Sequence, residues 1–294
     1  MKFGFVSFVG RPNAGKSTLL NRLVGTKLAI VSNKPQTTRT RILGVKNYPN
    51  AQVVFVDTPG IHRPLHRMNV RMMDVARDAM HEVDVLGLVV DVSEPPGNGD
   101  QFVLDLVKTS EAPVFLILNK IDMVKKTKLL PIIERFQKMG DFAEIIPISA
   151  FTGVNVDRLE QVIIDRLPEG EPMYPADYLT DQPERFMAGE IVREKLWQLT
   201  HAEIPYSSAV VIDRFEEPEG PKGLLKLYCT IVVERESQKP IVVGRGGAMI
   251  KAIGTAAREE LEKFFETKVF LDLHVRVKSE WREDEGVLND IGVK

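Results

Sequence analysis

Short hydrophobic runs alternate with amphipathic stretches in the first part of the chain, from Phe3 to about Leu167. Five runs are apolar over nearly their whole length: FGFVSFV, AQVVFVD, VLGLVVDV, VFLILN and EIIPIS. Such runs are typical of parallel strands that are buried on both faces of a sheet. Helical periodicity separates most of them, for example over Met68–Val83 and Val154–Leu167. The alternation predicts an α/β domain with a doubly wound sheet, whose ligands bind at the carboxyl ends of the strands.

The pattern changes after Leu167. The segment PEGEPMYPADYLTDQPE (Pro168–Glu184) is rich in proline and acidic residues and has no apolar periodicity. Such a segment is typical of a linker between domains. We therefore expect a first domain over residues 1–168, a linker over 169–183 and a second domain over 184–294.

The second domain begins with a helical stretch, RFMAGEIVREKLWQL. Two strand-like runs follow, SSAVVIDRFEE and LLKLYCTIVVERE, and the turn EPEGPKG between them favours an antiparallel pair. Two helical segments, AMIKAIG and TAAREELEKFFET, precede a last strand, VFLDLHVRVK. The order predicts a small αββααβ domain of the α+β class. We expect Trp197 and Trp281 to pack in a core, and the acidic EWREDEG to form a solvated tail.

Composition restricts the class of protein. The 294 residues are 44% hydrophobic and 27% charged, which is ordinary for a folded globular chain. The 39 Lys and Arg are balanced by 41 Asp and Glu, so a nucleic-acid site has to be a local patch. A single cysteine, Cys229, excludes an internal disulfide framework and suits a reducing cytosol. With no long apolar run and no signal peptide, we expect a cytoplasmic monomer.

The strongest motif is GRPNAGKS (Gly10–Ser17), directly after the first strand and at the start of a helical stretch. It fits G-x-x-x-x-G-K-[ST], in which backbone N–H groups surround phosphates at the positive end of a helix. Lys16 would contact the β- and γ-phosphates, and the Ser17 hydroxyl would bind Mg²⁺. The expected phosphate-binding set is Gly10, Arg11, Pro12, Asn13, Ala14, Gly15, Lys16, Ser17 and Thr18.

A second motif, NKID at the end of a buried strand, selects the base. The Asp122 carboxylate can accept from both N1–H and the 2-amino group of guanine, whereas adenine would leave it unpaired. Asn119 would help to hold the base, and the Lys120 side chain would pack over its face. A backbone N–H of Ser149 or Ala150, at the end of the next strand, would meet guanine O6. Guanine nucleotides, GTP and GDP, are the expected ligands.

The third motif, DTPG, also ends a strand, and its expected contacts involve Asp57, Thr58, Pro59 and Gly60. Asp57 would hold Mg²⁺ through a water molecule, and the Gly60 N–H would meet the γ-phosphate. The polar segment SNKPQTTRTR between the first and third motifs offers Thr37 and Thr38. One of them would close over Mg²⁺ when the γ-phosphate is present, and spacing alone does not choose between them.

A second glycine-rich turn lies in IVVGRGGAMIKAIG (Ile241–Gly254). It has neither the Lys-Ser of a phosphate loop nor the third glycine of a dinucleotide fingerprint, because Met249 stands there. It does fit G-x-x-G, the loop with which a K-homology (KH) domain clamps about four nucleotides of single-stranded RNA. G-x-x-G is also common in plain turns. The residues expected to contact RNA are Lys239, Gly244, Arg245, Gly246, Gly247, Lys251 and Arg258.

GRPNAGKS, QTTR, DTPG, NKID and SAFTG occur in this order, and together they resemble the Era group of translation-factor-related GTPases. Members carry a C-terminal KH domain, so the resemblance covers nearly the whole chain and implies a type II KH fold. It also implies a role in assembling the small ribosomal subunit by binding the 3′ end of its 16S RNA, and it favours Thr38 as the metal ligand. Some members associate with the inner membrane, although no lipid motif is visible here.

Two positions bear on the mechanism. Ile61 stands where Ras-like enzymes place a glutamine that orients the attacking water, so we expect slow hydrolysis. In the related GTPase TrmE, the asparagine that corresponds to Asn13 helps to bind K⁺, which makes K⁺ binding at Asn13 a hypothesis. The expected catalytic set is Asn13, Lys16, Thr38 and Gly60. Two alternatives stay open: an RNA-binding scaffold with incidental hydrolysis, and a P-loop kinase, which the NKID motif disfavours.

Overall fold

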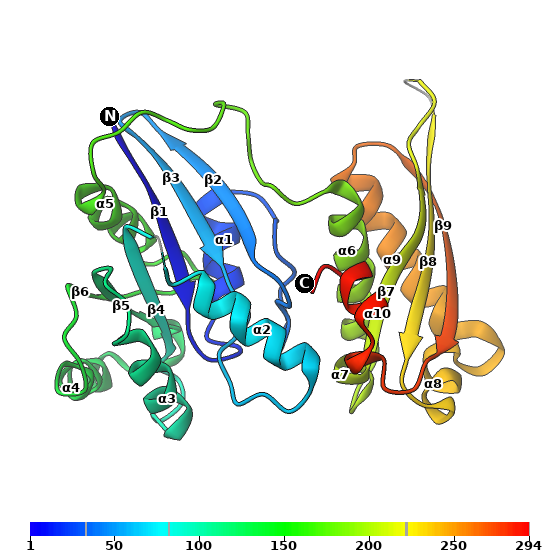
Figure 1. Ribbon diagram of the computed structural model, residues 1–294, viewed down its shortest axis with the longest axis horizontal. Helices are drawn as coiled ribbons and strands as arrows, with labels where there is room; N and C mark the ends of the chain where they lie inside the picture. Colours follow the sequence, from blue (N-terminus) through cyan, green and yellow to red (C-terminus); the bar gives the residue numbers. More distant parts are fainter. Residues whose placement is uncertain (33, 82, 221–222, 294) are drawn as a thin grey trace. The chain divides into compact units, whose positions relative to one another are not determined.

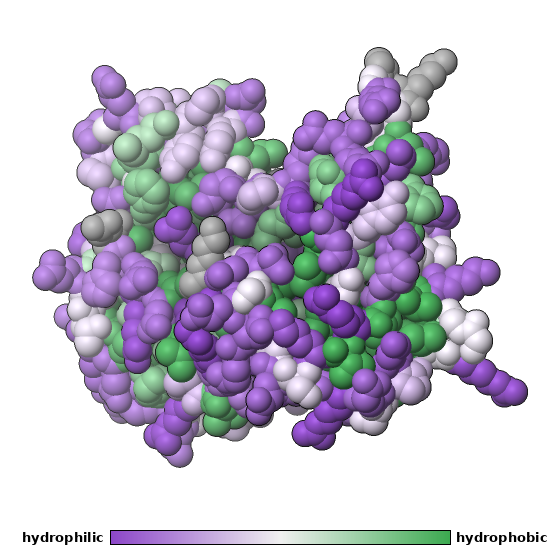
Figure 2. Space-filling model, turned by 45° about the vertical axis from the view of Figure 1, so that its right-hand side comes forward, coloured by the Kyte–Doolittle hydropathy of each residue, from purple (hydrophilic) through white to green (hydrophobic). Residues whose placement is uncertain are grey.

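The computed structural model describes residues 1–32, 34–81, 83–220 and 223–293, and it divides into two compact units. Unit 1 comprises Met1–Leu65 and Asn69–Asp181, and unit 2 comprises His66–Met68 and Gln182–Lys294. On the face drawn in Figure 2, hydrophilic side chains predominate and hydrophobic ones show between them in separate groups. No helix of the described part of the chain is both long enough and apolar enough to span a bilayer.

Unit 1 contains a six-stranded sheet in the order β2-β3-β1-β4-β5-β6 (Figure 1). Five strands are parallel, β1 (Lys2–Val9), β3 (Ala51–Asp57), β4 (Val85–Asp91), β5 (Val114–Asn119) and β6 (Glu144–Pro147). The helices are α1 (Lys16–Val24), α2 (Arg67–Asp78), α3 (Asn98–Val107), α4 (Lys126–Gln137) and α5 (Val156–Arg166). One apolar core joins the sheet to α1 and α5, and another joins it to α2, α3 and α4. The predicted doubly wound fold is confirmed.

Two strands differ from the prediction. β2 (Ile42–Tyr48) was missed, and it pairs antiparallel with β3 at the edge of the sheet. Its apolar run is short and interrupted by Gly44 and Lys46, which weakens the strand pattern. β6 is the opposite edge strand, and it is not buried on both faces because Glu144 is exposed. The helix expected over Met68–Val83 ends earlier, at Asp78.

Residues 169–181, here called the strap, run from the start of β1, where the Gly170 N–H donates to the Met1 carbonyl oxygen (2.8 Å), to the β2 edge of unit 1 (Figure 1). The Val45 N–H donates to the Leu179 carbonyl oxygen (2.8 Å), and the Thr180 hydroxyl donates to the Leu43 carbonyl oxygen (2.6 Å). These bonds satisfy backbone groups that an edge strand otherwise leaves unpaired. The first part of the predicted linker is therefore attached to the sheet of unit 1.

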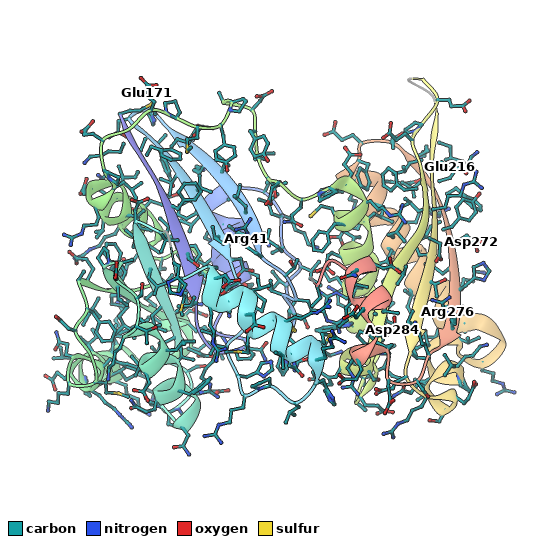
Figure 3. The ribbon with its side chains drawn as sticks, in the orientation of Figure 1. Arg41, Glu171, Glu216, Asp272, Arg276 and Asp284 are labelled. Atoms are coloured by element: carbon teal, nitrogen blue, oxygen red, sulfur yellow. The ribbon has the colours of Figure 1, made fainter. Side chains whose placement is uncertain are left out.

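Gln52, which is 1% exposed, holds the strap from inside unit 1. Its side-chain amide donates to the Tyr174 carbonyl (2.8 Å) and to Asn47 Oδ1 (2.8 Å), and its Oε1 accepts from the Tyr174 N–H (3.0 Å). At the end of the strap, Arg41 (labelled in Figure 3) pairs with Asp181 at 3.8 Å. The strap is thus fixed at several points along β2 and β3.

Replacing Gln52 with alanine should lower the free energy of unfolding of unit 1 by about 2 kcal/mol, because two partly buried backbone groups of Tyr174 lose their partner. Hydrogen–deuterium exchange of β2 and β3 in increasing urea measures this change. Gln101→Ala is the matched control, since the exposed Gln101 side-chain amide donates to Asp105 on its own helix (2.8 Å). Equal losses in the two variants would contradict the assigned role of Gln52.

Unit 2 contains a three-stranded sheet in the order β7-β8-β9. β7 (Ser208–Glu216) and β8 (Leu224–Val233) are antiparallel, and β9 (Lys268–Val277) is parallel to β8. The helices are α6 (Glu184–Leu199), α7 (Ile204–Ser207), α8 (Lys239–Val243), α9 (Ala248–Phe264) and α10 (Glu285–Asp290). One apolar core joins α6 and α9 to the inner face of this sheet. The αββααβ order is confirmed, with α7 and α10 as additions.

Three details of unit 2 were predicted wrongly. The two expected helices after the glycine turn are one helix, α9, which continues through Gly254. The second helix of the pair is α8, which lies before the glycine turn, where no helix was predicted. Pro240 in its first turn is suited to a helix start. The acidic tail is not fully solvated, because Trp281 is buried and its indole N–H donates to the Ser207 carbonyl (2.9 Å).

Candidate nucleotide and nucleic-acid sites

The phosphate loop joins β1 to α1, and its backbone conformation needs glycine. Gly15 has φ 97°, and a Cβ there would overlap the side-chain nitrogen of Asn119. Lys16 is 5% exposed, and its Nζ donates to the carbonyl oxygens of Gly10 (3.3 Å) and Arg11 (3.1 Å). Burial lowers the pKa of Lys16 to about 8, although the nearby Asp57 carboxylate opposes this shift. The loop therefore holds a desolvated amine beside the N-terminus of α1, where an anion is favoured.

Three predicted metal ligands from different segments meet beside the loop. The Ser17 hydroxyl lies 2.7 Å from Thr38 Oγ1 and donates to Asp57 Oδ2 (2.6 Å), and Thr38 Oγ1 also donates to that oxygen (3.1 Å). The other oxygen, Asp57 Oδ1, is buried and accepts no hydrogen bond from the described residues. Thr37 instead donates to the Lys34 carbonyl (2.7 Å).

These residues fit a magnesium ion. Mg²⁺ prefers oxygen ligands and is usually bound by one or two protein groups together with phosphates and water. Burial raises the pKa of Asp57, while Lys16 and the hydrogen bonds from Ser17 and Thr38 oppose the shift. A divalent cation would favour the ionised carboxylate and would satisfy the unpaired Oδ1. The geometry thus supports Thr38 over Thr37 as the switch residue.

Thr38→Ala should slow GTP hydrolysis by about tenfold or more while GDP affinity stays within about twofold, because Thr38 is expected to bind the metal only beside a γ-phosphate. Single-turnover hydrolysis and equilibrium binding of GDP measure the two effects. Thr37→Ala is the matched control, and both its rate and its GDP affinity should remain close to the wild-type values. A slow Thr37→Ala enzyme with a normal Thr38→Ala enzyme would reverse the assignment.

The DTPG motif is docked against the phosphate loop. Its Thr58 hydroxyl is buried and donates to the Phe8 carbonyl (2.7 Å), which is a structural bond within the sheet. A Cβ on Gly60 would come within 2.7 Å of the backbone of Pro12, and the Ile61 N–H donates to the Gly10 carbonyl (3.0 Å). Glycine is therefore required at position 60 for this close approach.

Asn119 joins the two loops that flank the predicted base site. Its amide nitrogen donates to the Ala14 carbonyl (2.8 Å), and its Oδ1 accepts from the Ala150 N–H (2.9 Å). The Ser149 N–H donates to the Val154 carbonyl (3.0 Å). Both N–H groups predicted to donate to guanine O6 thus already donate to an acceptor within the protein. A hydrogen bond from either group to O6 would have to be bifurcated.

Asp122 lies in a short 3₁₀ turn, Ile121–Met123, and its side chain is exposed at the rim of a cavity. The cavity has a volume of about 1230 Å³, and it is lined by the phosphate loop, residues 30–32 and 35–38, Gly60, Asn119, Lys120, Asp122 and Met123. Ligand sites of drug-sized molecules typically occupy about 300–1,000 Å³, so a nucleoside triphosphate fits. The described residues contain no group of three His, Cys, Asp or Glu that could hold a metal by themselves.

Sequence reasoning missed two charged contacts around this cavity. Arg11, predicted to contact phosphate, donates from Nη1 to Asp100 Oδ2 (3.0 Å) at the start of α3. Lys120 forms an ion pair with Asp91 at the end of β4. The only signal for Asp91 in the sequence was its place at the end of a buried strand, where polar residues are often functional.

The second glycine loop connects α8 to α9 in unit 2. Gly244, Gly246 and Gly247 all have positive φ (75°, 60° and 81°). A Cβ on Gly244 would lie 2.6 Å from the Met249 backbone nitrogen, so a side chain is excluded there. A Cβ on Gly246 or Gly247 would meet nothing within 4 Å, which leaves this side of the loop open.

Exposed cations lie in this loop and on the two helices that flank it. Lys239, Arg245, Lys251 and Arg258 are all exposed, and within the described residues the first three form no ion pair. Arg258 differs, because it lies near the Glu262 carboxylate. The pKa of Glu262 is lowered first by the hydrogen bond from the Val269 N–H and then by the charges of Lys268 and Arg258. The predicted RNA residues thus form a loop with uncompensated positive charge.

The outer face of the same sheet differs in its charge. Glu216 pairs with Arg214 (2.5 Å) and Lys226 (3.3 Å), and Asp272 pairs with His274 (3.0 Å). Figure 3 labels Glu216 and Asp272 on these strands. Because the Glu216 carboxylate offsets Arg214 and Lys226, this part of the face is less favourable for a polyanion than the glycine loop.

Together, the phosphate loop, the NKID segment and the αββααβ unit define a P-loop GTPase with a KH domain. Family models described as "50S ribosome-binding GTPase" and "KH domain" match residues 5–120 and 203–282. The chain is 50% identical to GTPase Era of Geobacter metallireducens over 98% of this chain and 97% of that protein, and 47% identical to GTPase Era of Heliobacterium modesticaldum over 99% and 97%. It belongs to the Era family of GTPases, which bind guanine nucleotides and hydrolyse GTP.

Two solved structures are similar over the full chain. One is Era in complex with MgGDPNP and nucleotides 1506–1542 of 16S ribosomal RNA (TM-score 0.95, 42% identity, 100% of this chain and 99% of that one). The other is a single-residue variant of Aquifex aeolicus Era bound to GDP·AlF₄⁻ (TM-score 0.94, 42% identity, 100% and 99%).

Proposed function

We propose that this protein hydrolyses GTP slowly and uses its KH domain to bind the single-stranded 3′ end of 16S ribosomal RNA during assembly of the small ribosomal subunit. The observation that carries this proposal is the open Gly244–Gly247 loop with its uncompensated cations. A sugar-phosphate backbone can approach such a loop closely. The relative that was solved with nucleotides 1506–1542 of 16S RNA supports the choice of RNA.

Slow hydrolysis follows from the side chains around the γ-phosphate position. Ile61 is 2% exposed and packs in the apolar core, so it offers no polar atom to orient water. Lys16 and the N–H groups of the loop would stabilise charge on the phosphates. Ser17, Thr38 and Asp57 would hold Mg²⁺, which supplies further neutralisation of that charge when bound.

Hydrolysis should be about tenfold faster in K⁺ than in Na⁺ if Asn13 helps to hold a monovalent cation beside the phosphates, since the cation would replace part of an arginine finger. Asn13 has φ 63° and is exposed at the cavity. Asn13→Ala should abolish the difference between the two salts, whereas Asn98→Ala, at the start of α3 in the cavity lining, should keep it. Phosphate release measured in matched KCl and NaCl buffers tests this, and equal wild-type rates would exclude the K⁺ role.

The RNA proposal is tested by crosslinking in cell extract, with the nucleotide and the residue of each crosslink identified. We expect crosslinks between the 3′ end of 16S RNA and residues 241–254. Crosslinks that lie only elsewhere on the chain would overturn the KH assignment.

The hydrolysis assay also separates the two candidate functions. An RNA fragment that covers nucleotides 1506–1542 should change the GTPase rate if the protein is a switch. A change of less than about twofold would favour an RNA-binding scaffold, stabilised by nucleotide, in which hydrolysis is incidental.

A further inference from the structure

Asp91 lies at the end of β4, directly beside the strand that carries the base motif. β4 and β5 are parallel neighbours, and Asp91 is paired in register with Asn119. The Val92 N–H then donates to the Asn119 carbonyl (3.0 Å), which extends the pairing past the strand end. The position of Asp91 relative to Lys120 is therefore set by the sheet and not by a loose loop.

The Asp91 carboxylate is oriented through both oxygens. Oδ1 accepts from the Ser93 N–H (2.9 Å) and from the Ser93 hydroxyl (2.5 Å), so a tight turn fixes the carboxylate plane. Oδ2 accepts from the Lys120 ammonium. The two side chains are 17% and 29% exposed, so this pair is shielded more than an ordinary surface ion pair.

Lys120 is thereby held at both ends of its side chain. Its backbone is in the left-handed region (φ 68°, ψ 34°), between Asn119, whose amide is bonded on both sides, and Asp122. A lysine tolerates this conformation only when its surroundings impose it. With the ammonium fixed by Asp91, the four-carbon stem is fixed along the wall of the cavity that Asp91, Lys120 and Asp122 all line.

We propose that Asp91 is a positioning residue of the guanine site, which holds Lys120 so that its apolar stem forms the flat surface against which the base packs. Without Asp91, the lysine ammonium would turn toward water and the stem would leave the cavity wall, because a long side chain gains rotamer freedom when its head is released. This inference rests on the placement of guanine between Lys120 and Asp122. Ser93 contributes by orienting the carboxylate.

The test measures the dissociation constant of a fluorescent N-methylanthraniloyl GDP for the full chain carrying Asp91→Asn, Lys120→Ala or both. We expect each single substitution to lower the affinity for the fluorescent GDP about tenfold. In the Lys120→Ala background, Asp91→Asn should lower it no further, because the effects of two residues that act through one another are not additive. The affinity for inorganic triphosphate, which has no base and is measured by its competition with the fluorescent GDP, should change by less than about twofold. Asp105→Asn is the matched control, since its carboxylate is exposed on α3 and its contacts lie nearby in the chain, to Gln101 (2.8 Å) and Lys108 (3.6 Å).

The outcomes separate the possible failures. Wild-type protein that does not bind the fluorescent GDP would overturn the guanine site itself. Normal binding by Asp91→Asn, or an additive loss in the double variant, would overturn the role of Asp91 alone. An equal loss of inorganic triphosphate binding would show that Asp91 merely maintains the fold of the loops.

Discussion

Asp122→Asn should lower the affinity for GDP and GTP by at least about a hundredfold and raise the affinity for xanthine nucleotides. The carboxylate can accept two hydrogen bonds, from N1–H and the 2-amino group of guanine. An amide replaces one of these acceptors with a donor, which then faces the 2-amino group. Xanthine has a carbonyl oxygen at that carbon, so the same amide becomes complementary to it.

Equilibrium binding of fluorescent GDP and XDP measures this exchange. The variant should fold normally, because Asp122 is exposed and lies in a short turn outside the sheet. Asp141→Asn is the control, since it removes an exposed carboxylate that does not line the cavity. A variant that keeps GDP affinity within about threefold and gains no XDP binding would show that Asp122 does not read the base.

The double substitution Arg245→Asp, Gly246→Asp should lower RNA affinity by about a hundredfold at moderate salt. It removes a cation and adds two anions within a few ångströms of the expected sugar-phosphate backbone, well inside the Debye length. Aspartate is among the residues that adopt the left-handed region, and a Cβ at Gly246 meets no atom within 4 Å. The fold of unit 2 should therefore survive.

Fluorescence anisotropy with an RNA covering nucleotides 1506–1542, repeated at several salt concentrations, measures the loss. Arg214→Asp reverses a charge on the outer face of the sheet in the same unit, and it should change the affinity by less than about threefold. GTP hydrolysis without RNA should be unaffected in both variants. Full RNA affinity in the loop variant would place the RNA site elsewhere on the chain.

The sequence predicted most of the strands because each is an apolar run with few polar interruptions. The motifs were clear for the same reason: GRPNAGKS, DTPG and NKID each follow a buried strand, and parallel strands bring their carboxyl ends to one edge of the sheet. β2 was not predicted, because it follows the polar segment SNKPQTTRTR directly and Gly44 and Lys46 interrupt its apolar run. In unit 2, the helix over residues 239–243 was missed because Pro240 at its start and Gly244 at its end limit it to little more than one turn.

What the sequence determined by itself was chemistry that depends on residues close together in the chain: the phosphate loop, the guanine motif and the G-x-x-G turn. What only the tertiary structure decided was which distant residues meet. Thr38 rather than Thr37 reaches Ser17 and Asp57 because the segment before β2 directs only one hydroxyl inward. Asp91 meets Lys120 because β4 and β5 are paired in register, and Gln52 bonds the strap 122 residues away. Such pairings are set by strand order and register, to which sequence spacing gives no access.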